Sequence, residues 1–263
     1  MFAHVSKSGS AFTQDDTVAY CYNNRSELTN AVAAVDSNYR CAYDFDDIGN
    51  RESSCERGSN TVYTANQLNQ YTAVDDFTPQ FDDDGNQTLI KTSTGIWQVQ
   101  YNCENRPIIW QCVSTNTPAP NPSTPSLLSM SYDRMGRRVT KNNQRFVYDG
   151  YLCIGKIEDS TSIHYSLSPI HCFVWDPTEP IATRPLVFYN SNVPPQYYTH
   201  DGNKNVSDLT DISQSNSAHY TYTPFGALLS SSGASAPSQP FRFSSEYADD
   251  AVGLVYYNYR HYN

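Results

Sequence analysis

The sequence is short of the charged residues on which helical proteins depend. Asp, Glu, Lys and Arg make up 17% of its 263 residues, whereas coiled coils and helix-rich chains draw heavily on Glu and Lys. The two stretches with helical spacing, which begin at Glu27 and Thr64, are each only about two turns long. We therefore expect strands or brief turns at both places.

Long apolar runs and an excess of basic charge are missing too. No stretch approaches the roughly 20 apolar residues of a membrane-spanning helix, and residues 1–16 lack the basic start and apolar core of a signal peptide. The formal net charge is -10, so the surface repels the phosphates of nucleic acids. These absences predict no membrane span, no visible signal peptide and no nucleic-acid partner.

The patterns of catalytic and metal sites are absent as well. The seven Cys form no C-x-x-C pair. The nearest approach to a ligand cluster is His164, His171 and Cys172, which do not share one face of a strand. The carboxylate pair Asp249/Asp250 falls in a predicted turn, where Asp is favoured for backbone reasons. We therefore expect no catalytic residue, no metal site and no cofactor, and we expect that the chain is not an enzyme.

Tyrosine, by contrast, is abundant. The chain has 21 Tyr, and aromatic residues reach 13%. Tyr is favoured in strands because its ring covers a half-buried pleated surface while its hydroxyl stays solvated. The mean hydropathy of -0.60 indicates a modest core. The composition therefore predicts an all-β chain.

Short segments with an aromatic residue, Asp and Gly recur along the chain. The clearest are YDFDDIGNR from Tyr43, FDDDGNQT from Phe81 and YDRMGRRV from Tyr132, and weaker copies stand between and after them. Successive anchors lie 21, 20, 18 and 20 residues apart, at Tyr22, Tyr43, Tyr63, Phe81 and Tyr101. This quasi-period is typical of a repeat that supplies one strand pair and its turn.

Each segment has the composition of a β-hairpin turn. The aromatic residue and the Asp or Asn after it end a strand, Gly supplies a positive φ, and the Asn that follows tolerates a left-handed backbone. One hairpin alone is marginally stable, whereas stacked hairpins bury a continuous ribbon. The predicted fold class is an all-β, mostly antiparallel sheet of stacked β-hairpins.

Proline-rich stretches mark the predicted boundaries, because Pro cannot donate to a β-ladder. We expect surface loops or sheet edges at residues 117–126, 190–196 and 230–240. The predicted organisation is an N-terminal extension at 1–17, a repeat array at 18–116, a Pro-rich linker at 117–126 and further repeats at 127–263.

The repeated segments resemble YD repeats, the building unit of bacterial Rhs proteins, Tc-toxin C components and animal teneurins. The end of the chain, HYTYTPFGALL followed by PFRFSSEYADDAVGLVYYNYRHYN, closely resembles the Rhs-associated core, which we place at about residues 197–263. The positions of the chain end that match are Pro224, Phe225, Gly226, Phe241, Arg242, Phe243, Gly253, Leu254, Tyr256, Tyr257, Tyr259, Arg260 and Tyr262. The other signature positions, structural in role, are Tyr43, Asp44, Gly49, Asn50, Arg51, Phe81, Asp82, Gly85, Asn86, Tyr132, Asp133, Gly136, Arg137 and Tyr222.

The resemblance implies a β-ribbon that spirals into a hollow shell around a toxic or otherwise sequestered segment, with this chain as an arc or small version of that shell. Family members usually continue past the position of Asn263 into a self-cleavage segment and a variable domain, which this sequence does not contain. We expect a structural or encapsulating module of an Rhs-type toxin or cell-surface protein, secreted or at the cell surface, without catalytic activity. Its partners would be a toxin or other polypeptide cargo, or the remaining shell segments.

The alternative function is a carbohydrate- or cell-surface-binding module. Exposed aromatic residues, including Trp97, Trp110 and Trp175, would then stack on sugar rings, whereas the opposing interpretation makes them the core between repeats. A metal-assisted hydrolase is the third class. Open ends of a stacked sheet also predict self-association.

One pair of cysteines is a candidate disulfide. Cys41 and Cys55 flank the turn in CAYDFDDIGNRESSC almost symmetrically, so we predict that they face each other across a hairpin. An offset of one residue in the register would instead place them on opposite faces of the sheet.

Overall fold

The computed structural model describes residues 2–5, 16–114, 127–158, 170–178, 184–257 and 259–263. Within these residues the strand pairings are antiparallel and follow the order of the sequence, and the helical elements are two 3-10 turns, η1 (Ala236–Ser238) and η2 (Phe243–Ser245). No helix in the described part of the chain is long and apolar enough to span a membrane. The predicted all-β, antiparallel fold is confirmed.

Residues 1–80 and 221–231 form one compact unit. Its core contains Tyr39, Cys41 and Tyr43, with Phe225 and Leu229 packed against them. The sheet of this unit has seven strands in sequence order, which are β1 (Phe2–Val5), β2 (Asp16–Tyr22), β3 (Leu28–Ala33), β4 (Arg40–Phe45), β5 (Arg51–Glu56), β6 (Ser59–Ala65) and β7 (Tyr71–Val74).

Residues 81–220 and 232–263 form the second unit. A long sheet follows the sequence through β8 (Gln80–Phe81), β9 (Gln87–Thr92), β10 (Gly95–Tyr101), β11 (Pro107–Ser114), β12 (Leu127–Tyr132), β13 (Arg138–Lys141), β14 (Gln144–Asp149), β15 (Leu152–Glu158), β16 (Ile170–Trp175), β17 (Pro185–Asn190), β18 (Val193–His200), β19 (Val206–Thr210) and β20 (Asn216–Tyr222). The next strand, β21 (Leu228–Ser232), consists almost entirely of residues of the first unit. A separate three-stranded sheet contains β22 (Tyr247–Asp249), β23 (Leu254–Tyr257) and β24 (Arg260–Tyr262).

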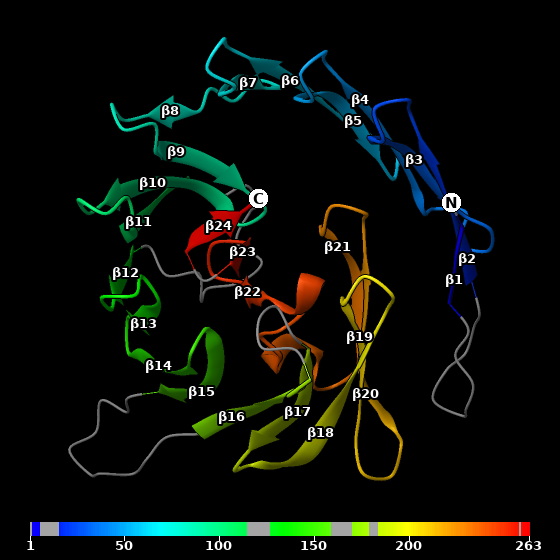
Figure 1. The fold of residues 1–263 in the computed structure, drawn as a ribbon, viewed down its shortest axis with the longest axis vertical. Coiled ribbons are helices and arrows are strands. Elements are labelled where there is room, and N and C mark those ends of the chain that lie inside the picture. The colour runs from blue at the N-terminus through cyan, green and yellow to red at the C-terminus, as the bar shows by residue number, and fades with distance from the viewer. Residues whose placement is uncertain (1, 6–15, 115–126, 159–169, 179–183, 258) are drawn as a thin grey trace. The chain divides into compact units, whose positions relative to one another are not determined.

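The C-terminal segment, residues 232–263, packs against the long sheet of the second unit. Figure 1 shows its small sheet, in red, on the concave side of the green and yellow strands. The main core joins the two: Trp97, Trp110 and Leu128 of the long sheet pack with Val252 and Leu254 of the C-terminal segment. The end of the chain is therefore an integral part of this unit's core.

Two of the three predicted loops prove to be partly strand, and the third, 117–126, falls outside the described residues. Strand β18 includes Pro194 and Pro195, so the prediction of a loop at 190–196 is wrong there. Val193 pairs with Asn190 and Gln196 pairs with Phe188. The two prolines therefore sit in a β-bulge, where no ladder hydrogen bond is required. Strand β21 extends to residue 232 and so overlaps the start of the loop predicted at 230–240. The first boundary between the two compact units lies between residues 80 and 81.

Candidate functional site

The repeated segments form one recurring seven-residue turn, which begins on the last residue of a strand. In the copy at Tyr132, the second residue, Asp133, donates its N–H to the carbonyl of Arg137 at 3.0 Å, and Gly136 donates to the carbonyl of Asp133 at 2.9 Å. Asp133 Oδ1 also accepts the N–H groups of Met135 and Arg137. The same backbone pattern occurs in turns that begin at Tyr22, Phe45, Ala65, Phe81, Tyr101, Tyr132, His200, Thr210 and Tyr222.

The fifth residue of every copy has a positive φ. Gly occupies it in four turns, at Gly49, Gly85, Gly136 and Gly226. Other residues occupy it elsewhere, namely Ser26, Asn69, Asn105, Lys204 and Gln214. Gly is the residue that adopts this conformation without strain, and this explains why the Gly-containing copies are the clearest in the sequence.

In six of the nine copies, the sixth residue is bound to the second by a complementary side-chain pair. Where the second residue is Asp, the sixth is often a donor: Asn50 Nδ2 lies 2.9 Å from Asp46 Oδ2, and Arg137 Nε lies 2.8 Å from Asp133 Oδ2. Where the second is Asn and the sixth is Glu or Gln, the roles reverse: Asn23 Nδ2 donates to Glu27 Oε2 at 2.6 Å, and Asn66 Nδ2 donates to Gln70 Oε1 at 3.1 Å. The Asn that follows Gly, at the sixth position, does not have a left-handed backbone in Asn50 or Asn86. The left-handed backbone belongs to the fifth position instead.

The structure corrects the register of one predicted copy. Phe45 and Asp46 occupy the places that Tyr132 and Asp133 hold in their turn. The predicted anchors Tyr43 and Asp44 lie two residues earlier, in strand β4. Tyr43 is a core residue whose hydroxyl donates to Glu56 Oε1 at 2.7 Å, and Asp44 Oδ2 accepts from Ser53 Oγ at 2.9 Å.

Tyrosine hydroxyls tie the start of several strands that follow a repeat turn to a neighbouring strand. The hydroxyl of Tyr132 donates to the carbonyl of Pro107 at 2.9 Å, and that of Tyr101 donates to the carbonyl of Gln87 at 2.9 Å. In the first unit the hydroxyl of Tyr71 accepts the N–H of Arg51 at 3.0 Å. Burial raises the pKa of Tyr101 to about 12. These tyrosines therefore act as neutral links between repeats.

A buried cluster of charges connects the C-terminal segment to strand β13. Asp249 forms ion pairs with Arg138 and Lys141, and both carboxylate oxygens are used. The N–H of Arg138 donates to the hydroxyl of Tyr256 at 3.0 Å, and its guanidinium lies 4.2 Å from the centre of that ring. His261 Nε2 lies 3.8 Å from Asp249 Oδ2. The cluster thus joins strand β13 to the three strands of the small sheet, β22, β23 and β24, which lie more than 100 residues later in the sequence.

The charges of this cluster stabilise one another. Burial alone would raise the pKa of Asp249, but Lys141 and Arg138 hold that pKa well below its ordinary value. Burial lowers the pKa of His261, which is therefore a neutral imidazole at pH 7. Removing one member of such a cluster leaves the others buried and uncompensated. The arrangement is consequently a structural joint whose charges depend on one another.

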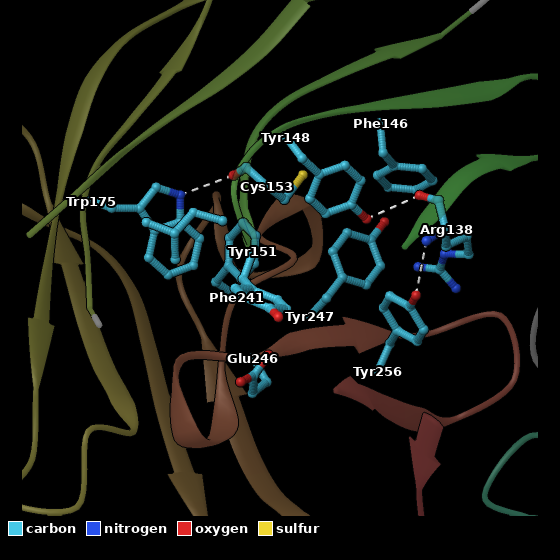
Figure 2. A pocket seen from close by; sticks show the side chains of 11 residues that line it. Arg138, Phe146, Tyr148, Tyr151, Cys153, Trp175, Phe241, Glu246, Tyr247 and Tyr256 are labelled. Atoms are coloured by element: carbon cyan, nitrogen blue, oxygen red, sulfur yellow. Dashed lines mark hydrogen bonds between the residues drawn. The ribbon is translucent and has the colours of Figure 1, made fainter. Parts of the chain in front are cut away.

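Beside this joint lies a small cavity with aromatic walls, shown in Figure 2. Tyr148 and Trp175 line it from the long sheet, and Phe241, Glu246 and Tyr247 line it from the C-terminal segment. Its volume of about 20 Å³ is enough for about one water molecule and too small for a substrate. Burial raises the pKa of Glu246 to about 7.

Five of the thirteen signature positions at the chain end are buried in the core. Phe241, Leu254 and Tyr256 are buried, and so is Phe243. Gly253 has a φ of +70°, and a β-carbon there would collide with Ser93. Other members lie near the surface: Tyr259 accepts a hydrogen bond from Arg106 through its carbonyl, and Arg260, Tyr257 and Tyr262 lie along the small sheet.

Two of the three tryptophans, Trp97 and Trp110, are too deeply buried to stack on sugars. Trp97 and Trp110 are 0% and 1% exposed, and Trp175 is half-buried and donates its Nε1–H to the carbonyl of Cys153 at 2.9 Å. The interpretation of Trp97 and Trp110 as core residues is therefore correct. Sequence reasoning missed Arg138, Lys141 and His261, and it treated Asp249 as a turn residue.

The structure also separates the candidate disulfide pair. Cys41 is opposite Glu56 and Cys55 is opposite Ala42, so the two cysteines are offset by one residue and point to opposite faces. Both are free thiols, and the predicted cross-strand disulfide is wrong. Among the described residues, no group of three or more His, Cys, Asp and Glu side chains has the arrangement of a metal site.

Comparisons with known proteins find similarity at the level of structure alone. No protein-family profile matches the sequence, and no curated protein matches it. The chain is similar to a chain in the crystal structure of TcdB2-TccC3, with 14% identity over 95% of this chain and a TM-score of 0.47. It is also similar to a chain of the Tc holotoxin pore of Photorhabdus luminescens, with 13% identity over 94% of this chain and a TM-score of 0.46. The chain spans 17% and 16% of the lengths of these two chains.

Proposed function

We propose that the chain is a structural β-repeat module of an Rhs-type toxin or cell-surface protein and forms an arc of the wall around a polypeptide. The observation that carries this proposal is the burial of the signature residues at the chain end. Phe241, Leu254 and Tyr256 are packed into the second unit together with Asp249. Signature residues that are packed in the core beside a structural ion cluster serve folding rather than catalysis.

The repeat turns support the same function. Neighbouring turns contact each other: Asn86 Nδ2 donates to Asn105 Oδ1 at 2.9 Å, and the guanidinium of Arg106 lies against Gly136. These contacts, with the tyrosine links between strands, make a continuous wall from a repeat of about 20 residues. The partner of such a wall is a polypeptide cargo or a further segment of wall. The protein itself is secreted or lies at the cell surface.

A protease-protection measurement tests the enclosing role. An unfolded reporter peptide is fused after Asn263, and its rate of cleavage is compared between the natural chain and Asp249→Asn, which breaks the joint of the C-terminal segment. The proposal expects at least tenfold slower cleavage on the natural chain. Equal rates, or rates equal to that of the free peptide, contradict it.

Self-association is part of the proposal, because a sheet with open edges pairs with further strands. In the first unit β1 and β7 are the end strands of the seven-stranded sheet. Light scattering over a hundredfold range of concentration should show a mass that rises above 29.6 kDa. A constant mass at the value of the monomer contradicts this part.

A further inference from the structure

The first unit contains a cleft that the repeat architecture does not require. Strands β5 and β6 form one wall and residues 227–229 form the other, around a volume of about 350 Å³. This volume lies within the range of small-ligand pockets, roughly 300–1,000 Å³. Ser54 and Glu56 of β5 are directly opposite Thr61 and Ser59 of β6. Hydroxyl groups thus line the floor of the cleft on one face of the hairpin.

Arg51 lies in this cleft on a platform of aromatic rings. Its guanidinium carbon is 4.4 Å from the ring centre of Phe225, 4.9 Å from that of Tyr43 and 5.7 Å from that of Tyr63. Tyr43 and Phe225 themselves meet edge to face at 4.8 Å. In the part of the chain that the structure describes, the guanidinium has cation–π contacts and no hydrogen-bond acceptor. Its donors are therefore held in place and unused.

A carboxylate is the group that fits an arginine held in this way. The planar fork of the guanidinium matches both oxygens of a carboxylate. The contacts of Arg51 with the rings of Tyr43 and Phe225 use none of its N–H donors, which are therefore left for a ligand. The chain carries a net charge of -10, so its overall field does not attract anions. Binding of an anion here depends on the local geometry at Arg51.

The remaining lining suits a ligand that carries hydroxyl groups. Ser54 Oγ and the Tyr63 hydroxyl lie 3.2 Å apart and share one hydrogen bond, and Thr61 lies beside them. Glu56 accepts the hydroxyl of Tyr43 at 2.7 Å and keeps further lone pairs for a ligand hydroxyl. Arg57 Nη1 donates to the carbonyl of Leu229 at 3.0 Å and so connects the two walls.

We infer that this cleft binds a sugar acid, with Arg51 on the carboxylate and the hydroxyls of Ser54, Thr61 and Tyr63 on the hydroxyls of the sugar. The site goes beyond the structural function and uses residues other than the tryptophans. It is independent of the joint at Asp249, which belongs to the second unit. The binding and the enclosing role therefore succeed or fail separately.

The test is a titration of the complete chain, followed by two-dimensional NMR of the backbone amides. Glucuronate should bind saturably with a dissociation constant of about 1 mM, or about -4 kcal/mol, and should shift the amides of Arg51, Ser54 and Thr61. Glucose lacks the carboxylate, and propionate lacks the hydroxyls, so each should bind at least tenfold more weakly. Equal binding of glucose contradicts the role of Arg51, and equal binding of propionate or of an acidic dipeptide contradicts the sugar.

Two variants locate the site. Arg51→Gln should abolish the preference for glucuronate over glucose. Because Arg51 also packs on three rings, Thr61→Trp provides a second route: it fills the cleft and leaves the platform unchanged. The matched control is Val62→Thr, since Val62 is the next residue of β6 and is 58% exposed on the opposite face. Unchanged binding in Thr61→Trp overturns the proposal, as does equal loss in the control.

Discussion

Arg138 and Asp249 are 111 residues apart in the sequence and form an ion pair whose side chains are 1% and 0% exposed. A buried pair of this kind commits two distant segments to one arrangement, because neither charge is tolerated alone in the interior. Lys141 joins the same carboxylate. The C-terminal segment is therefore fixed to strand β13 by charge as well as by apolar packing.

The first prediction concerns Asp249. Asp249→Asn leaves Arg138 and Lys141 buried without their counter-ion and should lower the free energy of unfolding of the second unit by about 3–5 kcal/mol. All three Trp lie in that unit, so Trp fluorescence in a urea titration measures the change.

The neighbouring carboxylate is the matched control. Asp250 pairs with Arg242, but its side chain is 61% exposed whereas that of Asp249 is 0% exposed, so Asp250→Asn should cost less than Asp249→Asn because the Asp250 carboxylate is largely solvated. Equal costs for the two substitutions would show that the joint at Asp249 contributes no special stability.

The second prediction concerns pH and Glu246. Because burial raises its pKa to about 7, the folded state binds a proton more tightly than the unfolded state, whose carboxyl has a pKa of about 4.5. The contribution of this group to stability is present below pH 4.5 and is lost as the pH rises to 7.

Glu246→Gln removes this dependence and should be more stable than the natural chain by about 3 kcal/mol at pH 8. The gain should disappear near pH 4. Melting temperatures of the two proteins between pH 4 and pH 8 measure it, and a constant difference over that range would show that Glu246 does not titrate as described.

The third prediction tests the complementary pair in the repeat turn. Asn50→Asp places a second carboxylate against Asp46 Oδ2, which now accepts from Asn50 Nδ2 at 2.9 Å, so the melting temperature should fall. Adding Asp46→Asn reverses the roles, as in the natural pair Asn23 and Glu27, and should recover most of the loss. A double variant no more stable than Asn50→Asp contradicts the rule.

The sequence predicts the turns better than the contacts between them. Gly85 and Gly136 mark their turns, because a positive φ selects Gly. The copy at Tyr43 is displaced by two residues because YDFDD contains two aromatic–Asp pairs, and only the hydrogen bonds of Asp46 distinguish them. Two other copies have Ser26 and Gln214 at the positive-φ position, where the sequence therefore gives no glycine signal.

The buried joint is a different case, because its partners are not neighbours in the sequence. Arg138 follows the turn at Asp133 and resembles a solvated strand charge, and Asp249 sits where turn preference alone would place an Asp. Nothing in the local pattern indicates that they meet. The prediction of the disulfide was wrong for a related reason. Symmetric spacing about a turn does not fix the pairing register of the two strands, and the bulge between Asp44 and Phe45 shifts that register by one residue.

The central claim is that the C-terminal segment is an integral part of the wall, and native-state hydrogen exchange tests it most directly. The amides of Leu254 and Tyr256 in the small sheet should open with the same free energy as those of Trp97 and Val99 in the long sheet, since one cooperative unit exchanges together. Asp249→Asn should lower the protection of both sets alike. If the amides of residues 247–257 exchange like those of a loop while Trp97 and Val99 stay protected, the C-terminal segment unfolds independently of the long sheet. That result would contradict the central claim.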